Sequence, residues 1–334
     1  MKKQIICFGV RDYEIETFKL LGAKYDYDLV LNKEYITNEN FEIGLNYEVV
    51  MVRGNCFLNF DSIKALKDSG MKYLLTRTVG FNHIDLDACK KLGVACARVP
   101  GYSPNSVAEL AVTYILSLNR SIVPSVNSTA SGDFTVQNFM FSPEIRNLTV
   151  GVLGCGRIGL TDARLMKGLG ARVIGYDLYE CEAGKDVLDK YATIEEIQQE
   201  CDVISVHMPY FKGENDNFID AEFISKMKDN SIIVNTARGE LVDASAVADA
   251  IESGKLRGAA MDVLANEKLT FFKKQSGDLV DPVANRLKNL FPKVLLTPHV
   301  GSATDEALKN MIEISLENLD EYLNNGTCKN SLIK

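Results

Sequence analysis

Residues 149–159 read TVGVLGCGRIG, an apolar strand that runs into a glycine-rich turn and then into a helix. Gly154 allows the tight turn, Gly156 lets the backbone approach a pyrophosphate, and Gly159 lets helix and strand pack closely. The amino end of such a helix attracts phosphate through its free N–H groups and its dipole. The pattern predicts a dinucleotide-binding unit.

An acidic residue stands where this unit needs one. Asp177 ends the next apolar run, residues 171–177, and follows Gly154 by 23 residues. Its carboxylate is placed to accept hydrogen bonds from the adenosine ribose hydroxyls and would repel a 2′-phosphate. Glycines that only make turns would not require this order of strand, turn, helix, strand and acid. We therefore expect NAD rather than NADP.

Apolar runs and helical patterns alternate on both sides of this unit. Six strands are expected from residue 149 onward, at 149–154, 171–176, 202–207, 231–236, 258–263 and 294–298. Five more are expected at 3–9, 27–32, 47–53, 71–78 and 94–99. This alternation favours parallel sheets with right-handed crossovers. We predict an α/β protein with two doubly wound parallel-sheet domains, and a final helix, 303–323, that returns to the first.

Length and composition agree with this prediction and exclude several classes. A chain of 334 residues fits about two domains, and 46% apolar with 25% charged residues is ordinary globular composition. A net charge of −8 without a basic cluster argues against nucleic-acid binding. No apolar run reaches the roughly 18 residues of a membrane span. Eight scattered cysteines without a CxxC pair indicate reduced thiols and no metal site. A cytoplasmic protein is expected.

The chain contains only three histidines, and one of them is expected to transfer protons if a hydroxyl or carbonyl group is the substrate. His299 follows the expected strand 294–298, and His207 ends the strand 202–207. Both lie at carboxyl ends of strands, where a doubly wound sheet carries its chemistry. Position alone leaves these two candidates. His83 precedes a helix, and we expect it at a cap or on the surface.

Four ordered motifs resemble the D-2-hydroxyacid dehydrogenase family over essentially the whole length. They are Gly154-Cys155-Gly156-Arg157-Ile158-Gly159, Asn235-Thr236-Ala237-Arg238-Gly239, Asp262-Val263 with Glu267, and Thr297-Pro298-His299-Val300-Gly301. The resemblance implies a flavodoxin-like catalytic domain, residues 1–101 and 300–334, and a Rossmann NAD-binding domain, residues 102–299. It also implies a cleft between the domains and a homodimer built around the helix near 104–120.

Catalytic roles follow from the matching positions. The resemblance makes His299 the acid/base, Glu267 its carboxylate partner and Arg238 the clamp on the substrate. Glu267 would stabilise the imidazolium, so that His299 can give a proton to the 2-oxo oxygen as hydride arrives at C2. Arg238 offers a planar fork to a carboxylate and can polarise the carbonyl. The resemblance thus selects His299 over His207.

Further contacts are implied in the same way. Asp262 would hold the nicotinamide carboxamide, and the backbone N–H groups of Val79 and Gly80 would complete the carboxylate site. The remaining cofactor contacts are expected at Arg157, Ile158, His207, Pro209, Thr236 and Ala237.

The resemblance implies a 2-oxo acid as the substrate, and the residues expected near its side chain favour two different substrate classes. Tyr102 and the insertion 268–292 resemble the D-lactate dehydrogenase branch, where the matching tyrosine lies close to the substrate. Arg53 and Ser302 depart from that branch. Arg53 follows a strand of the first domain, and a second cation there would suit a second carboxylate or a phosphate. Ser302 stands where the lactate enzymes carry an aromatic residue. Serine in place of an aromatic ring would make the pocket roomier and more polar.

We therefore expect a dicarboxylic substrate, with 2-oxoglutarate reduced to (R)-2-hydroxyglutarate as the first choice, because the pattern around Arg53 and Ser302 resembles enzymes of that substrate class. Pyruvate, giving D-lactate, and branched or aromatic 2-oxo acids remain alternatives. A different class, an NAD-sensing regulator without catalysis, would keep the glycine turn and Asp177. It would not need Arg238, Glu267 and His299 together, and their joint presence favours the enzyme.

Overall fold

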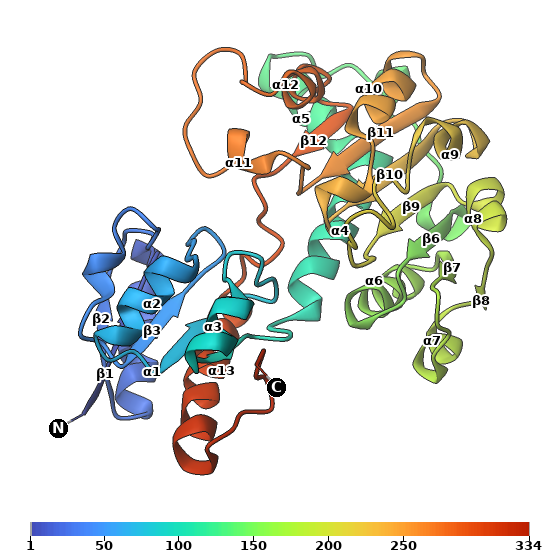
Figure 1. Ribbon diagram of the computed structural model, residues 1–334. Coiled ribbons are helices and arrows are strands. Elements are labelled where there is room, and N and C mark those ends of the chain that lie inside the picture. The colour runs from blue at the N-terminus through green and yellow to red at the C-terminus, as the bar shows by residue number, and fades with distance from the viewer. Residues whose placement is uncertain (1, 334) are drawn as a thin grey trace. The chain divides into compact units, whose positions relative to one another are not determined.

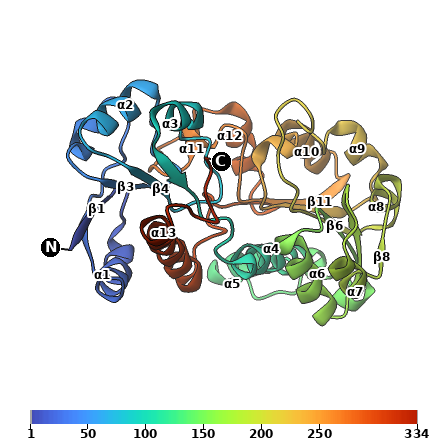
Figure 2. The ribbon, with the colours of Figure 1, turned by 60° about the horizontal axis from the view of Figure 1, so that its bottom comes forward.

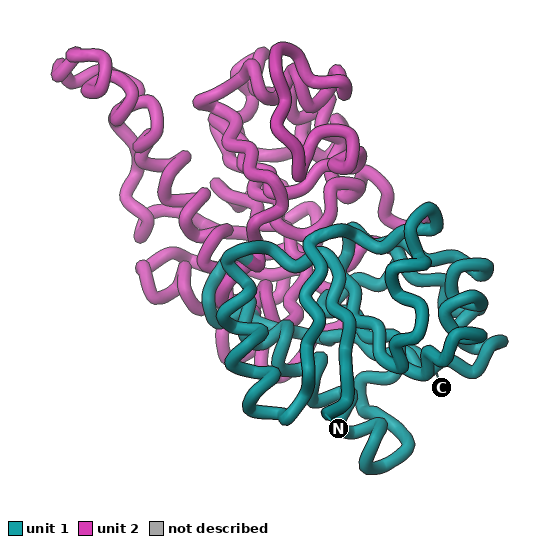
Figure 3. Tube along the Cα trace, turned by 90° about the vertical axis from the view of Figure 1, so that its left-hand side faces the viewer, with its two compact units in different colours: residues 1–103, 303–334 teal, residues 104–302 magenta. Residues whose placement is uncertain are grey.

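The computed structural model describes residues 2–333, which form two compact units (Figure 3). One unit contains the chain up to residue 103 together with the chain from residue 303 onward, and the other contains residues 104–302. Each unit has its own sheet, and the strand pairs that link neighbours in both sheets are parallel. The predicted fold class, α/β with two doubly wound parallel sheets, is confirmed.

The first unit holds a five-stranded sheet in the order β2-β1-β3-β4-β5 (Figure 1). Its strands are β1 (Lys3–Cys7), β2 (Tyr27–Leu31), β3 (Val49–Val52), β4 (Tyr73–Thr76) and β5 (Ala95–Ala97). The strand order reverses between β1 and β3, which makes their carboxyl ends a topological switch point. Ligands of open α/β sheets bind at such points, and Arg53 follows directly on β3.

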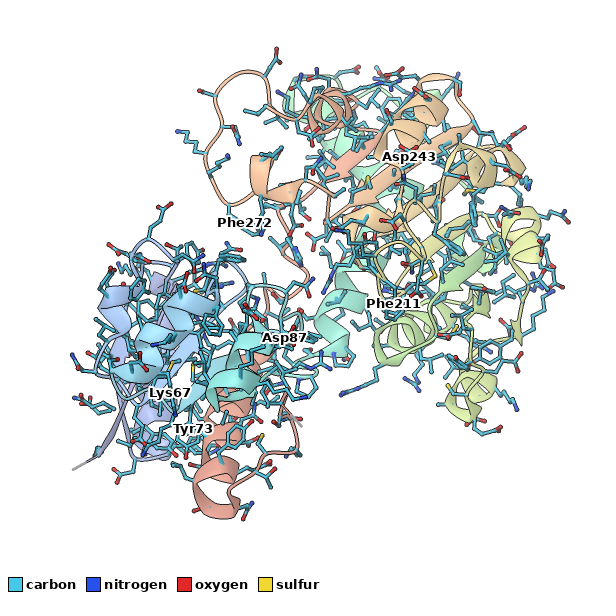
Figure 4. All side chains as sticks on the ribbon, viewed as in Figure 1. Lys67, Tyr73, Asp87, Phe211, Asp243 and Phe272 are labelled. Atoms are coloured by element: carbon cyan, nitrogen blue, oxygen red, sulfur yellow. The ribbon has the colours of Figure 1, made fainter. Side chains whose placement is uncertain are left out.

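Helices cover both faces of this sheet. They are α1 (Ile15–Lys24), α2 (Phe60–Asp68), α3 (Leu86–Leu92) and α13 (Asp305–Asn325). Alternate residues of the strands face α2 and α3 on one side and α1 and α13 on the other. Figure 2 shows α13 beside α1. Tyr322 of α13 packs on Tyr73 of β4 with ring centroids 5.7 Å apart, and Figure 4 labels Tyr73. The C-terminal helix therefore completes the core of the first unit, as the sequence predicted.

The second unit holds a seven-stranded sheet in the order β12-β11-β10-β9-β6-β7-β8. Its strands are β6 (Thr149–Leu153), β7 (Arg172–Tyr176), β8 (Lys190–Tyr191), β9 (Val203–Val206), β10 (Ser231–Asn235), β11 (Leu256–Met261) and β12 (Val294–Leu296). The expectation of six strands is wrong, because β8 is only two residues long and too short to show a periodic pattern. The switch point of this sheet lies between β6 and β9.

Nine helices of the second unit are described within residues 104–302. They are α4 (Pro104–Asn119), α5 (Ile122–Ala130), α6 (Arg157–Gly168), α7 (Glu182–Val187), α8 (Ile194–Glu200), α9 (Ala221–Lys226), α10 (Ala244–Glu252), α11 (Glu267–Thr270) and α12 (Pro282–Asn289). Helices α4 and α6 pack on one another and cover one face of the sheet, and α8, α9, α10 and α12 cover the other. Strands buried on both faces explain the continuous apolar runs in the sequence.

Across residues 2–333, no helix combines the length and the apolar character that a bilayer crossing demands. The cytoplasmic location stays a prediction.

Candidate active site

The glycine turn lies at the switch point of the second sheet, between β6 and β9. Gly154 has φ +92°, and a Cβ atom there would lie 2.6 Å from the amide nitrogen of Met208, so a side chain has no room. Asp177, at the end of β7, reaches across to this turn. Its Oδ2 accepts a hydrogen bond from the Cys155 N–H at 2.7 Å, and its Oδ1 accepts one from the Tyr179 N–H at 3.1 Å. The carboxylate is thereby fixed beside the turn.

The residues around this turn fit a dinucleotide that carries no 2′-phosphate. No atom lies within 4 Å of the position that a Cβ of Gly156 would take, so the backbone is open to a ligand at the start of α6. A cavity of about 450 Å³ beside Asp177 is also lined by Glu180, Glu195 and Glu196. These carboxylates would repel an additional phosphate group. Bound NADH would supply the hydride of the reaction.

His207 is enclosed beneath the glycine turn. Its Nε2 lies 2.9 Å from Oδ2 of Asp162 on α6 and 2.9 Å from Oγ of Ser205 on β9. Its side chain is 1% exposed and that of Asp162 is fully buried. A ring so enclosed is poorly placed to reach a substrate, so its burial favours His299 of the two candidate histidines, and the proton-transfer role stays a prediction. Sequence reasoning missed Asp162; the signal was an acid on the apolar face of α6, between Leu160 and Ala163.

His299 has the opposite environment. It follows β12 on a turn where its own φ is +56°, and its backbone N–H donates to the Asp262 carbonyl oxygen at 2.9 Å. Its imidazole Nδ1 donates to both carboxylate oxygens of Glu267, each at 3.1 Å. The His299 side chain is 37% exposed and that of Glu267 is 26% exposed. Because Glu267 takes Nδ1, Nε2 is the nitrogen that can exchange a proton with a ligand.

Asp262 shapes the turn that carries His299. Its Oδ1 accepts hydrogen bonds from the Thr297 hydroxyl and from the Val300 N–H, and its Oδ2 accepts one from the Gly301 N–H, the last two at 2.8 Å. Burial raises the pKa of Asp262 above its usual value, and these donors counteract that rise. The carboxylate therefore organises residues 297–301. Its contact with a nicotinamide carboxamide stays a prediction.

Helix α4 supports the same turn, a role that sequence reasoning missed. The Ser106 hydroxyl donates to the Gly301 carbonyl oxygen at 2.7 Å, and the Tyr114 hydroxyl contacts the Thr297 hydroxyl. Burial raises the pKa of Tyr114, so this phenol stays a neutral hydrogen-bonding group. Only the spacing of Ser106 and Tyr114 on one helix face could have indicated the role, and that spacing also fits ordinary core packing.

Arg238 follows β10 on a turn that comes close to the segment after β11. A Cβ atom at Gly239 would overlap the backbone of Leu264 and Ala265, so only glycine permits this approach. The Asn235 side chain closes the turn: its Nδ2 donates to the Arg238 carbonyl oxygen at 2.8 Å, and its Oδ1 accepts from the Ala237 N–H at 3.0 Å. The Arg238 side chain is exposed, and its Nη1 donates to the Ala237 carbonyl oxygen at 2.6 Å. Its remaining donors can bind a carboxylate.

The other expected cofactor residues lie around the same edge of the second sheet. Thr236 and Ala237 precede Arg238, and within residues 2–333 the buried hydroxyl of Thr236 has no hydrogen-bond partner. Arg157 and Ile158 begin α6, and Pro209 follows His207 at the end of β9. Their contacts with a cofactor stay predictions.

The expected substrate residues of the first unit lie after β3, after β4 and near residue 102. The turn after β4 is fixed, because Arg98 Nη1 donates to the Val79 carbonyl oxygen at 2.9 Å and the Thr78 hydroxyl donates to that of Gly80 at 2.6 Å. The Tyr102 carbonyl oxygen accepts from Asn310 Nδ2 at 2.7 Å. Ser302 belongs to the second unit, three residues after His299, and is partly buried.

The expectation for His83 is wrong. His83 is buried, with 7% of its surface exposed, and its Nε2 lies 3.0 Å from the Thr76 hydroxyl at the end of β4. Asp85, not His83, caps α3, since its side chain accepts from the Ala88 N–H. The ring became part of the core because the chain before α3 folds back over β4, which no local pattern indicates.

A family model for the D-isomer specific 2-hydroxyacid dehydrogenase NAD-binding domain matches residues 112–301. An aromatic 2-oxoacid reductase of Clostridium sporogenes is 39% identical over 332 residues, which cover 99% of both chains. The crystal structure of a D-lactate dehydrogenase from Treponema pallidum matches with a TM-score of 0.91 and 32% identity, over 99% of this chain and 100% of that one. A D-lactate dehydrogenase with NAD⁺ from Lactobacillus jensenii matches with a TM-score of 0.89 and 33% identity, over 99% of both.

The fold and these comparisons thus define an NAD-dependent oxidoreductase. The chain belongs to the D-2-hydroxyacid dehydrogenase family, which confirms the resemblance seen in its motifs.

Proposed function

We propose that this dehydrogenase reduces a dicarboxylic 2-oxo acid with NADH, with 2-oxoglutarate giving (R)-2-hydroxyglutarate as the preferred reaction. The observation that carries the proposal is Arg53, an incompletely paired cation at the switch point of the first sheet. The reaction is reversible, and the R configuration follows from the family.

The chain's own residues account for the proton and the orientation of the substrate. Arg238 binds the C1 carboxylate through its planar fork and polarises the 2-oxo group. Bound NADH would supply the hydride for C2, and Nε2 of His299 is the group that gives a proton to the oxygen, so that a hydroxyl group results. Glu267 stabilises the imidazolium before the proton is transferred, and it holds the ring in the correct orientation afterwards.

Arg53 is suited to the second carboxylate. Its side chain is only 19% exposed, yet within residues 2–333 its buried Nη1 has no hydrogen-bond partner. The nearest counter-charge is Glu14, whose Oε1 lies 3.8 Å away, beyond hydrogen-bond distance. A buried guanidinium that lacks a partner is unfavourable, and an anionic ligand would relieve this. The exposed part of the side chain leaves it open to such a ligand.

Relatives named for aromatic 2-oxo acids and for D-lactate make those substrates the main competitors. Ser302 argues against a fully apolar pocket, because its hydroxyl is partly exposed three residues after His299. Tyr102 is compatible with each of these substrates. The choice therefore rests on Arg53 and needs a direct comparison of substrates.

The test compares kcat/KM with NADH for 2-oxoglutarate, pyruvate, phenylpyruvate and 4-methyl-2-oxopentanoate. We expect the native enzyme to favour 2-oxoglutarate. Arg53→Ala should lower that value by about 10- to 150-fold, the worth of one charged hydrogen bond of ~1.5–3 kcal/mol, and change the monocarboxylates by less than about threefold.

Arg146→Ala is the matched control, because this arginine is 73% exposed in a surface ion pair with Glu144. It should leave all four values unchanged. A native enzyme that prefers pyruvate or phenylpyruvate would show that the proposed substrate is wrong, while the family assignment would stand.

We also propose that the enzyme is a homodimer, because α5 and the segment after it expose large apolar side chains. None of the residues of α5 is buried. The exposed residues are Ile122, Val126, Phe134, Val136, Phe139 and Phe141. Exposed apolar side chains that gather in one segment of the chain are typical of an interface, and this segment follows α4, the dimer helix that the family implies.

Sedimentation velocity tests the dimer. The native protein should sediment at twice the chain mass of 37.0 kDa, and Phe134→Asp combined with Val136→Asp should shift it toward one chain mass. Leu20→Asp is the control, since Leu20 is 71% exposed in the first unit. A native protein at one chain mass at micromolar concentration would refute the dimer.

A further inference from the structure

Charged residues gather at the carboxyl ends of β1, β3 and β4, where the Glu14 carboxylate lies between the guanidinium groups of Arg53 and Arg77 and a further arginine contributes its charge from nearby. Arg11 and Glu14 follow β1, Arg53 follows β3 and Arg77 follows β4. Three guanidinium groups and one carboxylate carry a formal sum of +2. The way in which the single carboxylate is shared decides which arginine stays available to a ligand.

Arg77 is locked in place. It is 2% exposed, and its Nη2 donates to the Phe8 carbonyl oxygen at 3.1 Å. Its guanidinium carbon lies 5.0 Å from the centroid of the Phe18 ring. Its Nη1 donates to Oε1 of Glu14 at 2.9 Å. The group therefore ties the end of β4 to the end of β1.

Both carboxylate oxygens of Glu14 accept hydrogen bonds from groups other than Arg53. Its side chain is 2% exposed, and its Oε2 accepts from the backbone N–H of Arg11 at 2.7 Å. Its Oε1 faces Arg77 at 2.9 Å and Nη1 of Arg53 at 3.8 Å. Arg53 therefore receives attraction from the carboxylate without a hydrogen bond.

The electrostatic balance at Arg53 agrees with this geometry. Burial lowers the pKa of its guanidinium below the ordinary value, and the charges of Arg77 and Arg11 lower it further, against the opposing charge of Glu14. Positive charge is thus in excess around Arg53, and an added anion would be attracted.

We propose that Arg77 is a positioning residue for substrate specificity: by holding Glu14, it prevents Glu14 from pairing with Arg53 and keeps Arg53 available for the distal carboxylate of the substrate. The inference rests on the proposed function. It assigns to Arg77 and Glu14 a role without contact with the substrate, since each acts through Arg53.

The test measures the ratio of kcat/KM for 2-oxoglutarate to that for pyruvate. In Arg77→Met, Oε1 of Glu14 loses its hydrogen-bonded partner and can close the 3.8 Å gap to Arg53. We expect the ratio to fall about 10-fold or more, mainly through a higher KM for 2-oxoglutarate. Arg77→Lys keeps a donor for Glu14 and should retain most of the preference.

A double variant separates positioning from a structural role. Glu14→Gln combined with Arg77→Met removes the competing charge, so we expect the ratio to recover to within about threefold of the native value. A variant that only loosened the fold would not recover in this way. If either methionine variant fails to fold, as judged by circular dichroism and NADH fluorescence, Glu14→Gln alone decides. It should keep or raise the ratio, and a fall of 10-fold would overturn the inference.

Arg53→Ala in the same assay separates failure of the proposed substrate from failure of the role of Arg77 alone. If it leaves the ratio unchanged, the proposed substrate fails and the role of Arg77 fails with it. If Arg53→Ala abolishes the preference while a folded Arg77→Met keeps it, only the role of Arg77 is refuted.

Discussion

Replacing His299 with asparagine is expected to lower kcat by about 10²- to 10⁴-fold, the usual contribution of a general acid. Asparagine cannot give up a proton at neutral pH, and Nε2 of His299 is the ring nitrogen that the structure leaves to the substrate, because Glu267 takes Nδ1 at 3.1 Å. The affinity for NADH should stay within about threefold. Steady-state kinetics and titration of NADH fluorescence measure the two quantities separately.

Two comparisons sharpen this prediction. Glu267→Gln keeps an acceptor for Nδ1 but removes the charge, so it should lower kcat by a smaller factor than His299→Asn. His207→Asn should leave most of kcat, because the His207 side chain is 1% exposed and its Nε2 faces Asp162. The opposite pattern, with His207→Asn inactive and His299→Asn active at unchanged NADH affinity, would assign the proton to His207. A protein without turnover for any 2-oxo acid would favour the NAD-sensing regulator.

Replacing Arg238 with alanine is expected to lower kcat/KM by about 10³-fold, or ~4 kcal/mol of transition-state stabilisation. The loss combines a two-point hydrogen bond to the carboxylate with polarisation of the developing oxyanion. Arg238→Lys keeps the charge without the planar fork, so we expect an intermediate value. NADH affinity should be almost unchanged, because the arginine side chain is exposed beside the turn and donates only to the Ala237 carbonyl oxygen among the described residues.

Chemical rescue tests the role of this side chain directly. Guanidinium added to Arg238→Ala should restore part of kcat/KM in a saturable manner, and added ammonium should restore less. The same additions to native enzyme and to Arg146→Ala serve as controls. A value of kcat/KM for Arg238→Ala within threefold of the native one would show that the carboxylate is bound elsewhere.

Much of the second unit could be predicted from local patterns. The glycine turn and the acid at the end of the next strand depend on short segments whose residue types have few other uses. The roles expected of Arg238, Glu267 and His299 came instead from the resemblance of their motifs to a known family. Elements without such patterns were missed. Strand β8 has two residues, and α5 has no buried face, so neither produces a periodic apolar signal.

The three histidines show what local sequence patterns could not predict, namely how deeply each side chain is buried. His207 and His299 both lie at the carboxyl ends of strands, and His83 precedes a helix. Their sequence positions therefore left the first two as candidates for proton transfer and predicted a cap or surface place for the third. Their roles depend on burial by distant segments. Asp162 on α6 encloses His207, and β4 contacts His83, whereas the turn of His299 stays half-open beside Glu267.

The amino-acid sequence by itself determined the fold class, the family and the use of NAD, because strand periodicity, a glycine turn and an ordered group of motifs are local properties of the chain. Only the tertiary structure showed how Arg53 is paired. A cation after a strand is equally compatible with a complete ion pair and with an open anion site. The order of β1, β3 and β4 in the sheet brings Glu14 between two arginines, and the hydrogen bond to Arg77 leaves Arg53 without one.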